Sequence, residues 1–347
     1  MTFSESLLFW YDAHRRELPW RGTRDPYPVW LSEIMLQQTQ TETVKGYYAR
    51  FLARFTDVNA LADAPEDEVL KLWEGLGYYS RARNLHAAAK KVAYEMDGRF
   101  PSDAAGLRGL PGIGPYAANA IASIAYGEPV PALDGNQARV LARVLAWEPP
   151  VKTPFDLLES ALERISRDRP GDYNQALMDL GATVCMPRQA LCDSCPVSAF
   201  CEARKADAAL DFPRKPVPIP RREEDWSIVL ATVRDRLLVR KRPGGLLGGL
   251  YEFAAVPGHL PPDELAARLE ALGFMRPAIV RRLPDARHVF THLVWRMQGW
   301  QVACDAAPDG FARADADMLQ TLPFPSALRV YREIANELLE DVSEPPE

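Results

Sequence analysis

The sequence lacks the features of a secreted or membrane protein. Its first residues, MTFSESLLFWYDAHRR, have acidic residues and an arginine pair where a signal peptide has a basic segment followed by an apolar core. No uninterrupted apolar run approaches the roughly 18 residues of a membrane span. These absences predict a reduced, cytoplasmic protein that has no membrane as a partner.

A surplus of basic charge is also missing. The chain has 41 Lys and Arg against 47 Asp and Glu, a net charge of −6. Residues 1–205 (23 basic, 26 acidic) and 206–347 (18 basic, 21 acidic) each carry −3. Bulk charge therefore does not indicate a nucleic-acid partner, and any DNA binding has to come from a local surface.

Cysteine is scarce, yet four of the five cysteines share one seventeen-residue window with the spacing Cys-x6-Cys-x2-Cys-x5-Cys. Four thiolates can hold a [4Fe–4S] cluster or a tetrahedral zinc, and disulfides are the alternative. A reducing compartment favours a metal, and the six- and five-residue gaps fit paired zinc knuckles poorly. We therefore predict an iron–sulfur loop on Cys185, Cys192, Cys195 and Cys201.

Period-two alternation is almost absent before Cys201, where apolar residues recur at three- and four-residue steps instead. This pattern predicts an all-α first half with N-caps at Ser102, Asp103 and Thr153. The expected helices cover residues 4–16, 29–44, 67–76, 81–96, 116–127 and 136–147.

The composition changes near residue 206. Four prolines within residues 211–226 predict a stiff linker, so we expect domains at 1–205 and 226–342 joined by a linker at 206–225. Strand pairs at 226–242, turning at Arg234–Asp235–Arg236, and at 288–304 with helices at 261–274 and 326–340 predict an α+β second domain. The last residues, 343–347, are expected to be disordered.

Two carboxylates stand out in the first half. Glu33 lies among Trp30, Leu31, Ile34 and Met35, which predicts a raised pKa suited to a general acid, unless Glu33 faces a solvated stripe. Asp134 comes before a helix, twenty residues after Gly114, where a plain N-cap is the alternative.

Three further segments have the residue types of a DNA-contacting surface. In LPGIGPYAANAIAS, Gly112 and Gly114 allow a tight turn that a phosphate can approach, although a plain helix connection is the alternative. Gln37 and Gln38 have amides suited to base edges. Tyr78, in a glycine-rich turn with basic residues after it, can wedge into a base step, unless it is one of a core tyrosine pair.

These segments, in this order with LPWR before them and LDGN after the hairpin, resemble the endonuclease III superfamily of DNA glycosylases and, within it, the MutY adenine glycosylases. The resemblance is dense over residues 8–202 and looser beyond. It implies a multi-domain chain in which an all-α helix–hairpin–helix glycosylase domain with an iron–sulfur loop precedes an α+β Nudix-like domain.

The resemblance also implies roles for the first-domain residues. Glu33 would protonate adenine at N7, Asp134 would stabilise or capture the sugar cation, Tyr116 would position Asp134, and Asn136 would order the site. Lyase-type members have a Lys where this chain has Tyr116, so we expect a monofunctional enzyme. The residues expected to bind substrate or DNA are Trp20, Arg21, Gln37, Gln38, Tyr78, Gly112 and Gly114.

In the second domain, Phe290, Thr291 and His292 stand where the family has Phe-Ser-His and are expected to recognise 8-oxoguanine. Glu264 and Glu270 are present, but they do not form the Arg-Glu-x-x-Glu-Glu arrangement of a working Nudix box, so pyrophosphate hydrolysis is not expected. Cys304 is expected to be a buried structural thiol.

The predicted function is excision of adenine mispaired with 8-oxoguanine or guanine in double-stranded DNA, after base flipping. We expect a monomer in the bacterial cytoplasm, at the nucleoid, whose cluster orders a DNA-contacting loop and does not cleave the bond. The sequence does not reveal whether the hairpin binds a monovalent cation. The alternatives are a pyrimidine mismatch glycosylase and a non-catalytic iron–sulfur DNA-binding protein.

Overall fold

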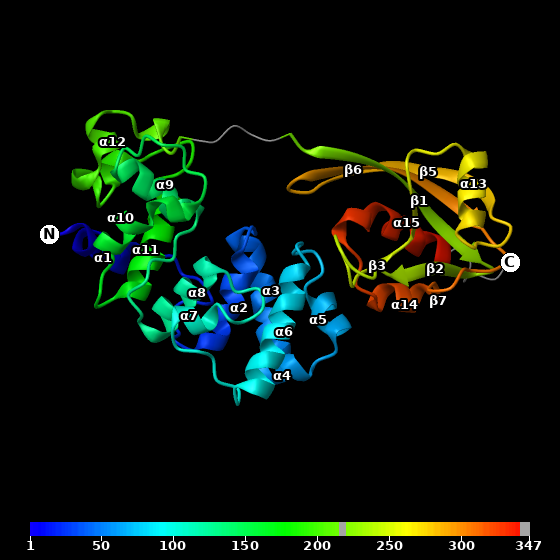
Figure 1. The fold of residues 1–347 in the computed structure, drawn as a ribbon, viewed down its shortest axis with the longest axis horizontal. Coiled ribbons are helices and arrows are strands. Elements are labelled where there is room, and N and C mark those ends of the chain that lie inside the picture. Colours follow the sequence, from blue (N-terminus) through cyan, green and yellow to red (C-terminus); the bar gives the residue numbers. More distant parts are fainter. Residues whose placement is uncertain (215–219, 341–347) are drawn as a thin grey trace. The chain divides into compact units, whose positions relative to one another are not determined.

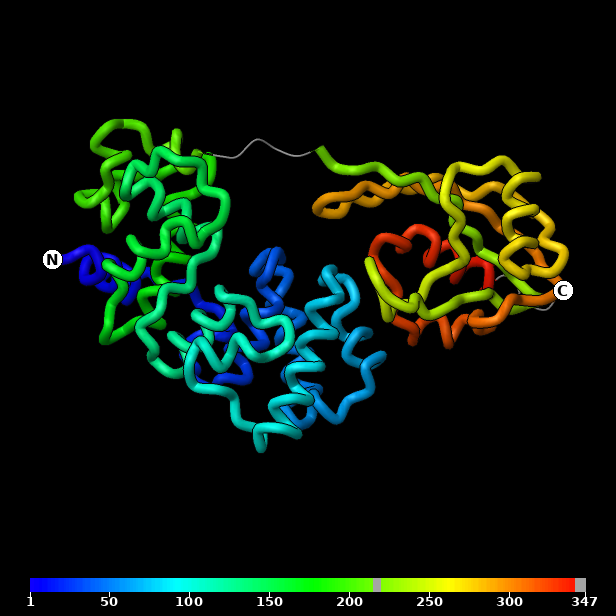
Figure 2. Tube along the Cα trace, viewed as in Figure 1, coloured from blue at the N-terminus to red at the C-terminus, as the bar shows by residue number. Residues whose placement is uncertain are grey.

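The computed structural model describes residues 1–214 and 220–340. Two compact units divide the chain, Met1–Ala64 with Asn84–Pro218 and Pro65–Arg83 with Ile219–Glu347 (Figures 1 and 2). The segment Pro65–Arg83 is thus counted with the second unit, although the sequence pattern places it in the first domain.

The first unit is built from helices, as the periodicity predicts. β pairing in its described part is confined to an isolated bridge between Cys185 and Ala190. None of the helices in the described ranges of either unit is long and apolar enough to cross a membrane. The helices of this unit are α1 (Phe3–His14), α2 (Pro26–Leu36), α3 (Thr41–Arg54), α4 (Val58–Asp63), α6 (Ser80–Glu95, from Asn84), α7 (Ala104–Leu107), α8 (Pro115–Ile121), η1 (Ala122–Tyr126), α9 (Gly135–Val144), η2 (Pro154–Leu157), α10 (Leu158–Arg164), α11 (Pro170–Thr183), η3 (Cys192–Ser194), η4 (Ser198–Phe200), α12 (Glu202–Lys205) and η5 (Ala209–Asp211).

Two local predictions in this unit are wrong. The expected helix over 29–44 is broken, because α2 ends at Leu36 and α3 begins at Thr41. The polar run between them has no apolar side chain to bury, and Gln38 turns the chain with a left-handed φ of +55°. Ser102 is not an N-cap, since Asp103 caps α7 by accepting from the Gly106 amide at 2.8 Å.

The second unit contains α5 (Glu66–Leu72) and a mixed sheet in the order β3-β2-β1-β6-β5. Central strands β1 (Arg222–Val233) and β6 (Leu293–Ala303) run parallel, and β5 (Ala278–Val289) is antiparallel to β6. The other elements are β2 (Arg236–Lys241), β3 (Tyr251–Glu252), β4 (Ala254–Pro257), α13 (Pro262–Ala271), β7 (Ala312–Ala314), α14 (Ala316–Thr321), η6 (Ser326–Leu328) and α15 (Arg329–Glu340).

The predicted linker is shorter on its C-terminal side. β1 begins at Arg222, because its ladder with β6 already includes the pair Arg222 and Leu293. Residues 215–219 of the linker and the predicted disordered tail lie outside the described residues.

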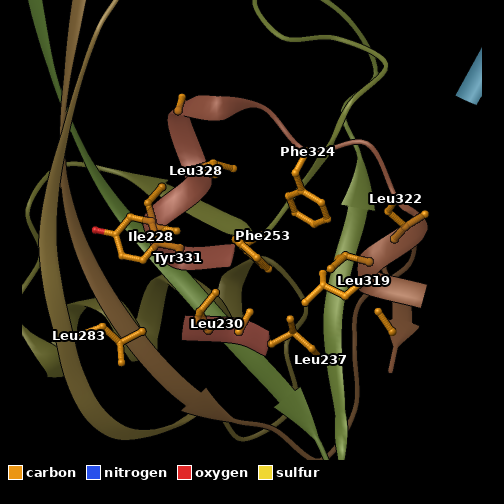
Figure 3. Close-up of a cluster of buried hydrophobic side chains, with 14 of the residues drawn as sticks. Ile228, Leu230, Leu237, Phe253, Leu283, Leu319, Leu322, Phe324, Leu328 and Tyr331 are labelled. Atoms are coloured by element: carbon orange, nitrogen blue, oxygen red, sulfur yellow. The ribbon is translucent and has the colours of Figure 1, made fainter. Parts of the chain in front are cut away.

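Both faces of the sheet are covered. One face packs against α14 and α15 through a cluster that includes Phe253, Phe324 and Tyr331 (Figure 3). The other face packs against α13 and holds Cys304, which is buried as expected. A Cβ at Gly299 would lie 2.4 Å from Cε1 of Tyr331, so this glycine lets α15 pack close to β6.

Candidate active site

Glu33 is a buried carboxyl group on α2, with only 5% of the residue exposed. Burial raises its pKa to about 7, and Asp134 acts in the same direction. The hydrogen bond from Tyr116 and the charge of Arg21 oppose the rise. The expected raised pKa is therefore present, and the alternative of a solvated helix stripe is wrong.

Tyr116 is hydrogen-bonded to Glu33, and the charge of Asp134, which the resemblance expected it to position, also acts on it. Its hydroxyl donates to Oε2 of Glu33 at 2.8 Å. Tyr116 lies in the first turn of α8, and α8 packs against α2, which brings the ring to Glu33. Burial and the nearby carboxyl groups raise the pKa of Tyr116 well above its usual range, so it stays a donor.

Asp134 is the N-cap of α9, as the simpler alternative suggested. Its Oδ1 accepts from the Gln137 amide at 2.7 Å and its Oδ2 from Nδ2 of Asn136 at 3.2 Å. Burial raises the pKa of Asp134, and these hydrogen bonds oppose that rise. The cap therefore holds the carboxyl group in one orientation, which is compatible with a catalytic role.

Arg139 is a site residue that the sequence reasoning missed. Its Nη2 donates to Oδ1 of Asn136 at 3.0 Å and to the Gly181 carbonyl at 2.7 Å. Its Nε donates to the Cys185 carbonyl at 2.9 Å. Polar contacts thus run from Asp134 to the backbone of the first cysteine. The sequence feature that could have identified this residue is an arginine one helical turn after Asn136.

A small cavity opens beside Glu33 in the first unit. Trp20, Arg21 and Tyr116 line it, as expected for pocket residues. Arg16 and Gln175 also line it and were not singled out from the sequence. The lining combines apolar side chains with two arginines and the Gln175 amide, which suits a flat heterocycle with polar edges.

The glycines of the hairpin differ in what they permit. Gly112 has a φ of +74°, and a Cβ there would lie 2.5 Å from Cβ of Asn84. Gly114 has an ordinary φ of −81° and caps α8, with nothing within 4 Å of a Cβ. Gly112 therefore makes the turn, while Gly114 leaves space beside it that a ligand can enter.

The four clustered cysteines have free thiols and line one apolar cavity. Burial raises the pKa of Cys195 to about 11, and the other three cysteines act in the same direction. Nη1 of Arg143 lies 3.2 Å from Sγ of Cys185. Within residues 1–214 and 220–340, no group of three or more His, Cys, Asp or Glu is arranged to hold a metal ion as it stands. The donor set of four sulfurs around one cavity, with a cation beside it, nevertheless fits an iron–sulfur cluster.

In the second unit, Tyr78 and Thr291 lie together. Tyr78 is 46% exposed, has a left-handed φ of +48° and lies with its hydroxyl 2.6 Å from Oγ1 of Thr291. Tyr79 is buried and donates to the Phe324 carbonyl at 3.1 Å. Only Tyr79 is thus a core tyrosine, and Tyr78 is presented to solvent.

The turn Phe290–His292 joins β5 to β6. The Phe290 amide donates to the Leu293 carbonyl at 2.8 Å, and the Phe290 ring packs edge-on against Trp295 at 5.1 Å. Nε of Arg221 donates to the Thr291 carbonyl at 3.2 Å. Thr291 and His292 are exposed, so this turn has an anchored backbone and accessible polar side chains.

The remaining expected residues occupy simpler positions. Gln37 is the half-buried C-cap of α2 and Gln38 is exposed beside it. Glu264 and Glu270 are exposed on α13. The buried Glu252 pairs with Arg240 and Arg242, so it supports the fold of this unit.

Comparisons with known families match both units. The family described as "HhH-GPD superfamily base excision DNA repair protein" matches residues 31–166, and the family described as "NUDIX domain" matches residues 227–333.

Among curated relatives, the adenine DNA glycosylase of Mus musculus is 37% identical over 92% of this chain and 74% of its own length. That of Homo sapiens is 37% identical over 88% of this chain and 67% of its own length. The adenine DNA glycosylase of Buchnera aphidicola subsp. Baizongia pistaciae is 40% identical over 58% of each protein.

Among solved structures, a thermostable thymine-DNA glycosylase has a TM-score of 0.55 at 29% identity, over 59% of this chain and 95% of that one. An endonuclease III trapped on DNA has a TM-score of 0.51 at 20% identity, over 59% of this chain and 94% of that one. The second likeness concerns the fold alone.

Proposed function

Because this chain belongs to the adenine DNA glycosylases of base excision repair, we propose that it excises adenine paired with 8-oxoguanine or guanine, after flipping the adenine out of the duplex. The observation that carries the proposal is the buried Glu33 carboxyl, hydrogen-bonded to Tyr116, at a cavity that Trp20 and Arg21 also line.

The proposed chemistry begins with Glu33. With a pKa of about 7, a large fraction of Glu33 is protonated near neutral pH and can donate to the purine ring. Tyr116 occupies Oε2, so Oε1 remains for the substrate. Protonation makes adenine a better leaving group, and the glycosidic bond then breaks with positive charge developing on the sugar.

Asp134 would stabilise that charge or capture the sugar transiently before water attacks, as paired carboxylates do in retaining glycosidases. Asn136 and the Gln137 amide hold the aspartate in place. The hydroxyl of Tyr116 cannot form a Schiff base, so the product is an abasic site and the strand is not cut.

Recognition of the opposite base is assigned to the second unit. Tyr78 would enter the gap in the stack, and the Thr291 hydroxyl would contact 8-oxoguanine. The exposure of both side chains and their hydroxyl contact at 2.6 Å support this assignment. Thr291 retains the hydroxyl of the family serine and adds a methyl group.

A [4Fe–4S] cluster is the cofactor we propose for the cysteine cavity. Cys185, Cys192, Cys195 and Cys201 would hold it, and it would order the loop that carries them. The free thiols fit a reducing compartment, so we place the protein in the cytoplasm. We also propose that it acts as a monomer. Purified protein should be brown and absorb near ~400 nm, whereas bound zinc would leave it colourless.

The test is single-turnover base release by the full chain from a panel of duplexes. We expect adenine release opposite 8-oxoguanine and guanine, and no thymine release opposite guanine. Thymine belongs in the panel because a thymine-DNA glycosylase shares this fold at 29% identity. Release of thymine without adenine would contradict the proposal, and borohydride trapping of wild-type chain on DNA would contradict the monofunctional mechanism.

A further inference from the structure

Asp179 is a fully buried carboxylate on α11 whose hydrogen-bond donors, among the residues that the structure describes, all come from the segment after α1. Its Oδ1 accepts from Nε of Arg16 at 2.6 Å and from Nη2 of Arg21 at 2.9 Å. Its Oδ2 accepts from the Arg16 amide at 3.2 Å and from Nη1 of Arg21. The two oxygens therefore accept four bonds, which is the full capacity of a carboxylate.

Both arginines reach the cavity that contains Glu33. Arg16 and Arg21 line this cavity together with Glu33, whereas Asp179 lies behind them with no exposed side-chain surface. Arg21 is further confined by the ring of Tyr11, 5.5 Å from its guanidinium carbon. Arg21 has both terminal nitrogens on Asp179, whereas Arg16 bonds to this carboxylate through Nε of its side chain.

We propose that Asp179 is a positioning residue for adenine excision, which holds the Arg16 and Arg21 guanidinium groups at the base cavity and balances their charge beside Glu33. The inference rests on the proposed function, since it concerns the same cavity. Asp179 does not touch the substrate in this arrangement and acts through the two arginines.

The contacts explain why a carboxylate is needed at this position. Asparagine has the same size, but its NH₂ group would face an arginine N–H, so at least one of the four bonds would be lost. The two guanidinium groups would then lie together at the cavity with no anion between them. A glutamate is larger by one methylene but keeps both acceptor oxygens.

The charges around Glu33 give the sign of a pH effect. The groups that act on Glu33 are Tyr116, Asp134 and Arg21. On the Asp179 side, Arg16 and Arg21 bond to the carboxylate, and Arg15 and Asp172 also act on the neighbouring Tyr11. Removing the negative charge of Asp179 leaves the cavity more positive, which favours ionised Glu33 and lowers its pKa. Removing the positive charge of Arg16 has the opposite effect.

The experiment measures single-turnover adenine release by full-length Asp179→Asn and Asp179→Glu, each with a melting curve. If Asp179 acts by holding the arginines, D179E retains most of the wild-type rate and D179N loses about tenfold or more. If the position matters only for packing, the isosteric D179N is the better of the two, and that order would overturn the proposal. Asp172→Asn, on the same helix but in a half-exposed pair with Arg169, is the matched control and should change the rate less than about twofold.

The pH profile supplies a readout that packing does not move. The rate should decline above neutral pH as Glu33 ionises, and D179N should shift the midpoint of this decline to lower pH by roughly one unit. Arg16→Met should shift the midpoint to higher pH. It also tests the proposal if D179N does not fold, because Arg16 is partly exposed and its loss leaves Asp179 paired with Arg21.

An unchanged midpoint in both D179N and R16M, or in R16M when D179N does not fold, would overturn the role of Asp179. Wild-type chain that releases no adenine from either mispair would contradict the proposed function and this inference with it. If the wild-type chain releases adenine normally and D179N is faster than D179E, only the inference is contradicted.

Discussion

The Glu33 cavity in the first unit and the Phe290–His292 turn in the second differ most in how much water reaches their functional atoms. Glu33 is 5% exposed, and its pKa is raised because burial penalises the carboxylate. Thr291 and His292 are exposed on a turn whose backbone is anchored by Leu293 and Arg221.

The difference fits the role that we propose for each region. Proton transfer at neutral pH needs a carboxyl group whose pKa has been moved by its surroundings. Reading a base that stays in the duplex needs donors and acceptors that the DNA can reach. Substitutions in the buried cavity should therefore abolish chemistry, whereas substitutions in the exposed turn should change which duplex is chosen.

The largest effect is expected for Glu33→Gln. The amide keeps the shape of the side chain but cannot donate the proton, so single-turnover release should fall by about 10³-fold or more. Binding to the mispaired duplex should stay within about threefold of wild type, because the substitution leaves the shape of the cavity unchanged. Normal release by this variant would show that the buried Glu33 carboxyl is not the proton donor.

A smaller loss is expected for Asp134→Asn. Asparagine is as good an N-cap as aspartate, so α9 should keep its stability while the negative charge near the sugar is lost. Release should fall by about 10²-fold with little change in melting temperature. A rate near that of wild type would show that Asp134 serves only as the cap.

The cysteine loop offers a third contrast within the first unit. Cys192→Ser, at a half-buried position of the proposed cluster, should weaken duplex binding by about tenfold and lower the rate of bound enzyme less. Titration of binding and single-turnover release at saturating enzyme separate the two effects. An equal loss in both would place the loop closer to the chemistry than the contacts through Arg139 suggest.

Thr291→Val should change selectivity more than rate. Valine replaces the hydroxyl with a methyl group of similar size, which removes the contact with Tyr78 and the proposed bond to the lesion. The preference for 8-oxoguanine over guanine opposite adenine should fall by about fivefold, while release from the guanine duplex stays near wild type. Thr321→Val, whose hydroxyl bonds within α14, is the control and should leave the preference unchanged.

Much of the first unit could be predicted because its signals are local. Helical periodicity, the apolar neighbours of Glu33 and the position of Asp134 before a helix all lie within short windows of sequence. The break between α2 and α3 was missed because apolar residues continue the helical pattern across a polar turn. Arg139 was missed because its bond to the cysteine loop joins residues 46 apart, and Asp179 was missed because its arginine partners lie about 160 residues away.

The sequence by itself determined the residue types and the order of the segments: a carboxylate in an apolar helix, glycines at the hairpin, four close cysteines and Tyr116 in place of a lysine. The tertiary structure decided which groups meet. It directs Tyr116 to Glu33, links Asp134 through Asn136 and Arg139 to the cysteine loop, and buries Asp179 behind two arginines. Burial and charge pairing depend on elements that pack from distant parts of the chain, so the spacing of residues alone cannot specify them.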